Sequence, residues 1–426
     1  MTITTAQMDG WFKRVYEKYE NAVPNFAKVR KLAKFVTEKR QGDSFRFPVK
    51  LTRSHGITWN GGSTAGTAFT LNAAVSMTTK EANLSGSEFI LREQISYGAI
   101  SRSGSAEGGY GPIMDEVPLD MAESANFYLE MALLYGGTDI GTVSGDPGGG
   151  PNARAVTISI PTWTPGIWAQ MEGAFVDFWS AGYAALRSAA HDTKIDSIDV
   201  ANRTITVSGT EADLDAIADL DIIVPRGAVA DGAPGTNNWF LGIDKILTNV
   251  GTLFGVAGAT YSNWLSQSHA VGGVAATVTQ FQRGLGRAVG RGLVDDEVTC
   301  LVSTFTWQDV NNDLAALRRY ADSTKQGLDI GTDKITLYGV HNGPLSIVAH
   351  PMVKSGEAFA VPFRYAKRVG STDVTFKLPD APEGSFFRTL TDTAGVEMRN
   401  YFDQAFIITK PARCVKYTGI TNSVAA

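Results

Sequence analysis

Within residues 8–39, apolar side chains recur three or four positions apart on both sides of Pro24, and Gly42 follows. This spacing is typical of one face of an α-helix, and a proline in the interior breaks a helix. The pattern therefore predicts one or two helices between residues 8 and 39. The apolar positions are Trp11, Phe12, Val15, Tyr19, Phe26, Val29, Leu32, Ala33 and Val36.

From Phe45 to Leu51 apolar and polar residues alternate, and a second extended run covers residues 89–100. Alternation with a period of two predicts strands. The stretch 55–70 between them is rich in glycine and threonine. Two strands joined by a long tip predict an extended hairpin. The tip is too poor in apolar residues to be stable alone, so we expect the hairpin to lie on another surface.

Two longer helices are predicted at 116–135 and 165–190. Pro118 suits the first turn of the first helix, and Gly136-Gly137 marks its end. Thr164-Pro165 opens the second. The expected buried stripe of the first comprises Val117, Met121, Ala125, Tyr128, Leu129 and Ala132, and that of the second Trp168, Met171, Phe175, Phe178 and Trp179.

The second half of the chain alternates short strands with one helix. Residues 195–208 predict a hairpin that turns at Asn202-Arg203, and a strand is expected at 221–224. A strand at 299–303 leads into a helix that begins near Thr306 and ends near Tyr320. Further strands are expected at 334–340, 344–349, 357–363 and 373–378. The result is a mixed α+β body.

Residues 403–420 form an apolar, β-branched run that is interrupted at Pro411 and stops at Thr418-Gly419. Proline cannot donate a ladder hydrogen bond, so it is confined to edge strands or bulges. We therefore expect an edge strand or a bulge at this point.

Charge is sparse and unevenly distributed in a chain of 426 residues, long enough for two or three domains. Charged residues are 19%, there are 45 glycines, and the net charge is −5. Residues 1–40 carry nine basic and four acidic side chains, which leaves −10 on the remainder. A basic arm on an acidic body indicates contact with a polyanion or an acidic neighbour, or else a solvated helix face.

The sequence carries no sign of secretion, disulfides or a membrane span. No apolar segment follows Met1, so we expect no signal peptide and a cytoplasmic origin. Cys300 and Cys414 both lie in strand-like runs and do not form a disulfide framework. Residues 246–282 contain no charged side chain, but polar residues interrupt every apolar run. We expect this stretch to be a loop buried between subunits.

One glycine motif and one arginine stripe are candidates for phosphate binding. Gly284-Leu-Gly286-Arg-Ala-Val-Gly290 is similar to a dinucleotide-binding turn, but the residues before it predict a helix rather than a strand. Arg283, Arg287 and Arg291 are four residues apart and share one helix face. We expect that face to meet phosphates or an acidic neighbour, or else to face solvent or another subunit.

No catalytic, cofactor-binding or metal-binding set emerges from the remaining polar residues. The five histidines lack ligand spacing, Ser63 lacks the strand-turn-helix setting of a hydrolase nucleophile, and nothing near Asp295-Asp296 would raise a carboxyl pKa. We therefore assign no site residues and expect neither a cofactor nor an enzyme. The histidines are His55, His191, His269, His341 and His350.

The order of these elements resembles the Hong Kong 97 fold of tailed-bacteriophage major capsid proteins. The resemblance rests on the basic arm, the long hairpin, the helix near 113–136, the strand and Trp-containing helix at 298–320, Val396–Tyr401 and the Pro-interrupted ending. It implies the following division: N-arm 1–40; extended E-loop and stems 41–105; P-domain with spine helix 106–160; A-domain 161–374; P-domain return strands 375–402; and A-domain closing strand 403–426.

The resemblance implies a structural function. Copies would form pentamers and hexamers of an icosahedral shell around double-stranded DNA, assembled in the host bacterial cytoplasm. The implied partners are further copies, a separate scaffolding protein, a portal, a possible decoration protein and DNA held by non-specific contact, with no membrane. An encapsulin-like compartment shell and a nucleotide-dependent enzyme that uses Gly284–Gly290 are the alternatives.

Some members of the family join an E-loop lysine to a P-domain asparagine beside a glutamate. Glu397 matches that glutamate, but 385–396 contains no asparagine and no lysine lies between Lys50 and Lys80. We therefore expect a shell without covalent cross-links. The chain begins at Met1, so we also expect no cleaved N-terminal scaffold.

Overall fold

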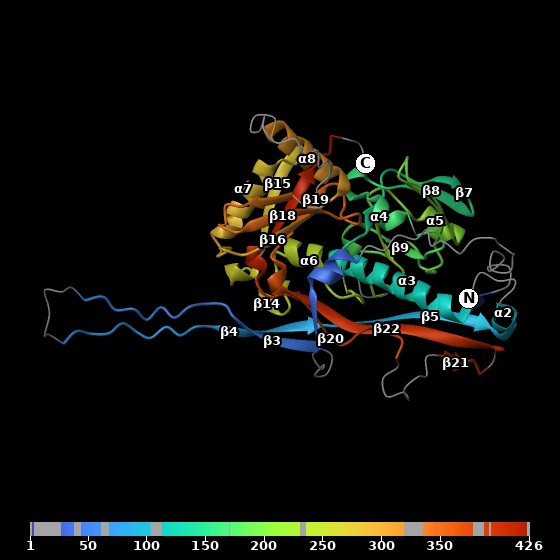
Figure 1. The fold of residues 1–426 in the computed structure, drawn as a ribbon, viewed down its shortest axis with the longest axis horizontal. Coiled ribbons are helices and arrows are strands. Elements are labelled where there is room, and N and C mark those ends of the chain that lie inside the picture. The colour runs from blue at the N-terminus through green and yellow to red at the C-terminus, as the bar shows by residue number, and fades with distance from the viewer. Residues whose placement is uncertain are drawn as a thin grey trace, which may run out of the picture.

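A computed structural model describes residues 2–3, 27–37, 44–60, 68–103, 113–169, 171–230, 236–318, 335–377, 387–391 and 393–423. Two six-stranded sheets, a lobe of smaller sheets and one long helix make up the body, and a hairpin projects from one end (Figure 1).

The first large sheet supports the long helix α3. Its strand order is β1-β5-β22-β20-β2, with β21 paired to β22. These strands are β1 (Thr2–Ile3), β2 (Lys34–Thr37), β5 (Ser87–Ser96), β20 (Ala366–Thr375), β21 (Phe387–Thr389) and β22 (Gly395–Ile408). Helix α3 (Ile113–Tyr135) lies over β5 and β22 (Figure 1).

Helix α3 confirms the prediction for 116–135. Val117, Met121, Ala125 and Leu129 are buried, as the apolar stripe requires, and Pro118 lies near the start. A side chain at Gly136 would overlap the carbonyl oxygen of Phe240. The helix therefore ends where a glycine permits close approach of another segment.

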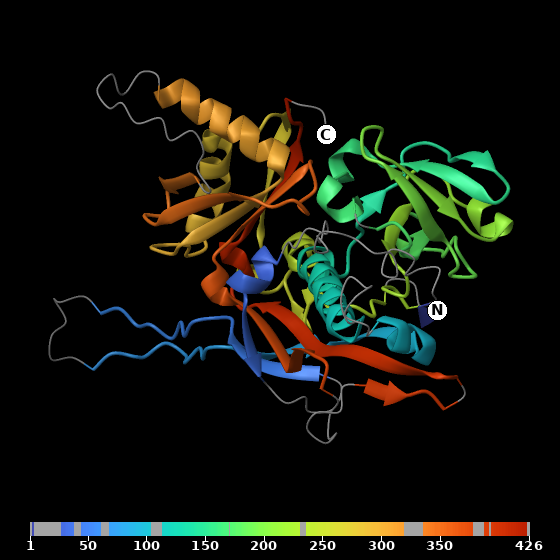
Figure 2. The same ribbon diagram turned by 45° about the vertical axis from the view of Figure 1, so that its right-hand side comes forward.

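The second large sheet has the order β15-β23-β19-β16-β18-β17 and carries α7 and α8 (Figure 2). Helix α7 packs on β15 and β23, whereas α8 packs on β18. The elements are β15 (Gln267–Val274), α7 (Val278–Val289), β16 (Val298–Val302), α8 (Thr304–Arg318), β17 (Ile335–Tyr338), β18 (Pro344–Ala349), β19 (Glu357–Val361) and β23 (Val415–Ile420). The Ser303 hydroxyl accepts a hydrogen bond from the Thr306 amide at 3.1 Å, so α8 begins two residues earlier than predicted.

The remaining lobe contains a four-stranded and a three-stranded sheet. The hairpin predicted at 195–208 is present, and Arg203 adopts a φ of 55° in its turn. The elements of the lobe are β6 (Gly141–Thr142), β7 (Gly148–Gly150), β8 (Ala153–Thr157), α4 (Pro165–Trp168), β9 (Val176–Trp179), β10 (Lys194–Asp199), β11 (Thr204–Ser208), α5 (Glu211–Asp215) and β12 (Ile222–Pro225). Helix α6 (Ile243–Thr248) lies outside this lobe, against α3, β15 and β23, and the two-stranded sheet of β13 (Thr252–Leu253) and β14 (Val256–Ala257) contacts β4 through β14.

The helix predicted at 165–190 is wrong. Only α4 (Pro165–Trp168) is helical, and β9 follows as a strand whose four residues are all buried. Gly173 and Gly182 adopt φ values of 86° and 73°, which a continuous helix does not allow. Part of the aromatic pattern comes from a strand that is buried on both faces and therefore has a continuous apolar run. Periodicity alone cannot distinguish such a run from a buried helix.

The second half of the N-terminal arm is not the long helix that the sequence predicts. Helix α1 (Lys28–Leu32) spans five residues, and the chain then enters β2, which pairs in parallel with β20. Phe35, Val36 and Thr37 favour a strand once a neighbouring edge is available. Residues 8–26 of the predicted helical segment lie outside the described residues.

The partner predicted for the first hairpin strand is also wrong. Strand β3 (Ser44–Lys50) pairs with β4 (Thr79–Ser85), whereas β5 lies between β1 and β22 in the large sheet. The extended run predicted to reach Ile100 ends at Ser96, where α2 (Tyr97–Ser103) begins.

Pro411 does not lie within a strand. It begins a single 3₁₀ turn, Pro411–Arg413, through which the chain passes from β22 in one large sheet to β23 in the other. Both strands have a partner on each side, so the expectation of an edge strand is wrong. Strand β23 continues to Ile420 because Gly419 accommodates a φ of 67°.

The uncharged stretch 246–282 is not one loop. It contains β13, β14, the strand β15 and the start of α7. Trp264 is buried within its own subunit, and its indole nitrogen donates to the carbonyl oxygen of Leu253 at 2.9 Å.

Candidate assembly surfaces

The hairpin arm consists of two extended legs, residues 51–60 and 68–78, which continue outward from β3 and β4. Figure 1 shows the legs running away from the body. At its base, Phe45, Leu51, Ala82 and Leu84 belong to the main hydrophobic core.

A β-bulge lies where the arm leaves its base. Lys50 pairs with Thr79 in the β3–β4 ladder. The amides of Leu51 and Thr52 then both donate to the carbonyl oxygen of Thr78, at 2.9 and 3.4 Å. Further out, the His55 amide donates to the carbonyl oxygen of Val75 at 3.0 Å, so the register has shifted by one residue. Such a shift exchanges the two faces of a strand.

The bulge brings the large apolar side chains of both legs onto one face of the arm, as an apolar stripe. In β4 the buried residues Ala82 and Leu84 occupy even positions, so odd positions on that leg face outward. On the leg that continues β3, odd-numbered residues face inward within the strand. The extra residue of the bulge reverses this orientation, so beyond the bulge the odd-numbered residues of both legs lie on the same face. Six large apolar side chains are at least half exposed, and all have odd numbers: Ile57, Trp59, Phe69, Leu71, Val75 and Met77.

This stripe was missed in the sequence, although its period of two was visible. Trp59 is 89% exposed, and Leu71 is 72% exposed. A large exposed apolar surface of this kind is typical of an interaction site.

The N-terminal arm is held on its own subunit by Glu130 of α3. The amides of Val29 and Arg30, at the start of α1, both donate to this carboxylate, the second at 2.9 Å. A carboxylate at the N-terminus of a helix satisfies amides that have no partner within the helix. His350 bonds the same carboxylate.

The basic residues of the arm differ in their contacts. Lys28 donates to the carbonyl oxygen of Ala349 at 2.8 Å, and Arg30 lies 3.6 Å from Asp373. These two are therefore engaged within the subunit. Lys31 and Lys34 are exposed, and the predicted contact with an acidic neighbour or DNA rests on them.

A buried charge network joins the end of α3 to the second large sheet. The Lys416 ammonium lies 2.6 Å from Glu357 and also pairs with Asp244, whereas Lys354 pairs with Asp139 at 2.9 Å. Burial, together with the neighbouring Asp244 carboxylate, raises the pKa of Glu357. The Lys354 amide also donates to the hydroxyl of Tyr135 at 2.8 Å, so Lys354 links the end of α3 to the segment that enters β19.

The structure explains the glycine motif at Gly284–Gly290 without a nucleotide. The motif lies inside α7, and a side chain at Gly284 would overlap the ring of Tyr417. Arg287 and Arg291 donate to the carbonyl oxygens of Ser268 and Ser262, at 2.5 and 2.7 Å. The stripe therefore serves in part to attach α7 to the preceding segment.

The histidines lie in separate environments. His55 is exposed on the arm. His191 bonds Asp177 at 2.8 Å, and His269 bonds Gln280 at 2.9 Å. His341 is buried, which lowers the pKa of its imidazole. Across the described ranges, no three metal-ligating side chains come together.

Of the neighbouring residues Asp295 and Asp296, the second is held by arginines. Asp296 is buried and pairs with Arg413 at 3.0 Å and with Arg364, while Tyr365 donates to its carboxylate at 3.2 Å. Asp295 is exposed beside it. Ser63 lies outside the described residues.

Glu397 is buried and pairs with Arg92 at 2.6 Å and with Arg399. Hydrogen bonds from Gln94, Arg399 and Arg92 outweigh the effect of burial and lower the pKa of its carboxyl group. Both cysteines are buried as free thiols. Among the described helices, none is both long and apolar enough to cross a membrane.

Comparison with solved structures identifies the architecture. The structure is similar to the capsid asymmetric unit of cyanophage A-1(L), with a TM-score of 0.51 over 96% of this chain and 97% of that chain, at 12% identity. The chain has a phage capsid fold. This confirms the Hong Kong 97-like α+β fold expected from the sequence.

Two further solved structures are similar to this chain over most of its length. The capsid of a native GTA particle gives a TM-score of 0.48 at 10% identity, covering 96% of this chain and 95% of that chain. A structure of Mycobacterium phage Bobi gives 0.46 at 10% identity, covering 98% and 99%. No protein-family model and no curated protein matches the chain.

Proposed function

We propose that this protein is a major capsid protein, a structural and non-enzymatic subunit whose copies form the pentamers and hexamers of an icosahedral phage head. The observation that carries the proposal is the exposed apolar stripe on one face of the hairpin arm. The chain has a capsid fold, and its exposed apolar stripe is a surface that contact with another copy would bury. Interdigitated arms bury such surface in closed assemblies.

The division into N-arm, E-loop, P-domain and A-domain belongs to the same proposal. The sheet that supports α3 corresponds to the P-domain, and the sheet with α7 and α8 corresponds to the A-domain. The arm 51–78 corresponds to the tip of the E-loop. The pair of buried Lys354 with Asp139, 2.9 Å apart, supports a fixed junction between the two domains.

The proposed contents and partners are double-stranded DNA, a separate scaffolding protein, a portal and a decoration protein, with assembly in the host cytoplasm. Exposed Lys31 and Lys34 support a non-specific contact with DNA. Such a contact is screened by salt over about 10 Å at 0.1 M ionic strength.

A test of the proposal exchanges neighbouring residues on the arm without changing composition. Thr58→Trp together with Trp59→Thr moves the indole to the other face, whereas Ile57→Trp together with Trp59→Ile keeps it on the stripe. Electron microscopy of the purified proteins should show shells for the wild type and the second pair, and at least a tenfold loss for the first. Absence of shells from the wild type under all assembly conditions, scaffold included, would contradict the proposal.

A further inference from the structure

The chain passes between the two large sheets through two neighbouring crossings, each of which contains a single 3₁₀ turn. Phe363–Tyr365 leads from β19 into β20, and Pro411–Arg413 leads from β22 into β23. Strands β20 and β22 are antiparallel neighbours, so both crossings lie at the same end of the first sheet. The Thr409 amide donates to the carbonyl oxygen of Tyr365 at 2.9 Å and joins the two crossings directly.

Three cations from these crossings surround the ring of Tyr365. The Lys410 ammonium lies 4.3 Å from the ring centre, and the guanidinium carbons of Arg364 and Arg413 lie 4.7 and 5.1 Å from it. The Arg413 amide donates to the Lys410 carbonyl oxygen at 3.1 Å and so closes the turn that carries both cations. Lys410 and Arg364 are exposed, so an ion from solution can reach them.

A single buried carboxylate in contact with these cations balances only part of their charge. Asp296 pairs with Arg364 and Arg413, and it accepts a hydrogen bond from the Tyr365 hydroxyl at 3.2 Å. The Lys410 ammonium has no acceptor among the described residues. Burial, together with the guanidinium groups of Arg413 and Arg364, lowers the pKa of Lys410. The site therefore has an excess of positive charge.

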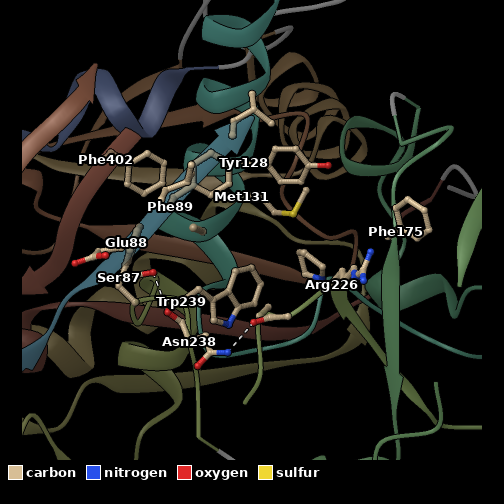
Figure 3. Close-up of a pocket in the computed structure, with 17 residues that line it drawn as sticks. Ser87, Glu88, Phe89, Tyr128, Met131, Phe175, Arg226, Asn238, Trp239 and Phe402 are labelled. Carbon is tan, nitrogen blue, oxygen red and sulfur yellow. Dashed lines mark hydrogen bonds between the residues drawn. The ribbon is translucent and has the colours of Figure 1, made fainter. Parts of the chain in front are cut away.

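The groove between β5, α3 and the segment 225–240 offers a contrast (Figure 3). Arg226 lies 5.1 Å from the centre of the Phe175 ring, and it is the one basic residue among the described residues that line this groove. Positive potential increases when several cations share one site, so the crossings should attract an anion more strongly than Arg226 does. Arg226 is therefore a matched control for the loss of one cation beside a ring.

We infer that the two crossings form a binding site for a phosphate-type oxyanion, held by Lys410 and Arg413 from one crossing and by Arg364 from the other. Each arginine pairs with Asp296 through Nη1, which leaves Nε and Nη2 as donors for the anion. Phosphate oxygens accept charge-assisted hydrogen bonds from ammonium and guanidinium groups. A bound anion would connect the two crossings and stiffen the junction between the large sheets.

Two sources supply this chemistry: the free phosphate ion and the phosphodiester groups of DNA. All the groups that hold the anion belong to one subunit, so binding does not require copies to assemble. The site can therefore be tested separately from the proposed function.

The test is calorimetric titration of the full-length protein with inorganic phosphate, at an ionic strength held constant with sodium chloride. Lys410→Gln removes one cation without breaking an ion pair to a described residue, and it should raise the Kd for phosphate roughly tenfold. Arg364→Gln should weaken binding similarly, because Asp296 keeps its pair with Arg413. Both variants should keep the wild-type melting temperature in chloride. Arg226→Gln should bind phosphate as the wild type does.

A double-stranded oligonucleotide distinguishes the two sources. If DNA is the ligand, Lys410→Gln should weaken oligonucleotide binding as well, and phosphate should displace the oligonucleotide from the wild type. If the free ion is the ligand, Lys410→Gln should lose phosphate but bind the oligonucleotide as the wild type does. Absence of saturable phosphate binding by the wild type, or equal phosphate affinity of the wild type, Lys410→Gln and Arg364→Gln, would overturn the site. Shell formation by the wild type would still support the proposed function in that case.

Discussion

His350 Nε2 lies 2.9 Å from Glu130 Oε1, and neither side chain is exposed. The other ring nitrogen, Nδ1, accepts a hydrogen bond from the Met352 amide at 3.2 Å. Since Nδ1 accepts, the proton resides on Nε2, and His350 is a neutral donor to the carboxylate. The second large sheet, which leads into His350, thus orients the carboxylate that receives the amides of Val29 and Arg30.

Removal of this carboxylate should release the N-terminal arm. Glu130→Ala leaves two backbone donors and one imidazole donor unpaired in a buried site, at about 1–3 kcal/mol for each group. We expect the free energy of unfolding to fall by roughly 3 kcal/mol or more in urea titrations, and trypsin to cleave faster at Lys28 and Arg30. Glu81→Ala, which removes an exposed pair with Arg46, should change stability by less than about 1 kcal/mol. Equal protease resistance of the wild type and Glu130→Ala would contradict this role.

The stability of the protein should depend on the protonation of Glu93. Burial, and next the Asp120 carboxylate, raise the pKa of Glu93 from 4.5 to about 7. A raised folded-state pKa means that the folded chain binds this proton more tightly than the unfolded chain does. The contribution of Glu93 to the free energy of unfolding is therefore fully present below pH 4.5 and is lost as the pH rises through about 7.

Glu93→Gln stays neutral throughout this range. Its urea midpoint relative to that of the wild type should therefore increase from below pH 4.5 to above pH 7. The exposed Glu81→Gln serves as the control and should show no such trend. A relative midpoint that stays constant or decreases with pH would rule out a raised pKa.

Two glycines of α7 should respond oppositely to alanine. Gly284→Ala would press a methyl group into the ring of buried Tyr417, and overpacking of this kind costs about 1–3 kcal/mol. Gly286 is exposed with no atom within 4 Å of an added methyl, so Gly286→Ala should stabilise the helix by about 0.5–1 kcal/mol. Thermal unfolding of the two variants measures whether each substitution lowers or raises the stability of the protein. A stable Gly284→Ala protein would show that the packing of α7 on Tyr417 does not require glycine.

The sequence alone determined those elements whose local signals agree with one another. Helix α3 was predictable because its apolar stripe, its early Pro118 and its terminal Gly136 all indicate the same segment. The hairpin at 195–208 was predictable because its alternation and its Asn202-Arg203 turn fix both strands. The order of such elements was sufficient to indicate the capsid fold.

Tertiary structure decided the pairing of strands and the direction of exposed faces. Strand β9 and strand β2 form because neighbouring strands supply their hydrogen bonds, which no local pattern specifies. Pro411 is tolerated between two strands with partners on both sides because the chain changes sheets there. The apolar stripe that contains Trp59 is visible in the sequence as an alternation with a period of two. The side it faces depends on a single extra residue opposite Thr78, because one residue of register exchanges the two faces of a strand.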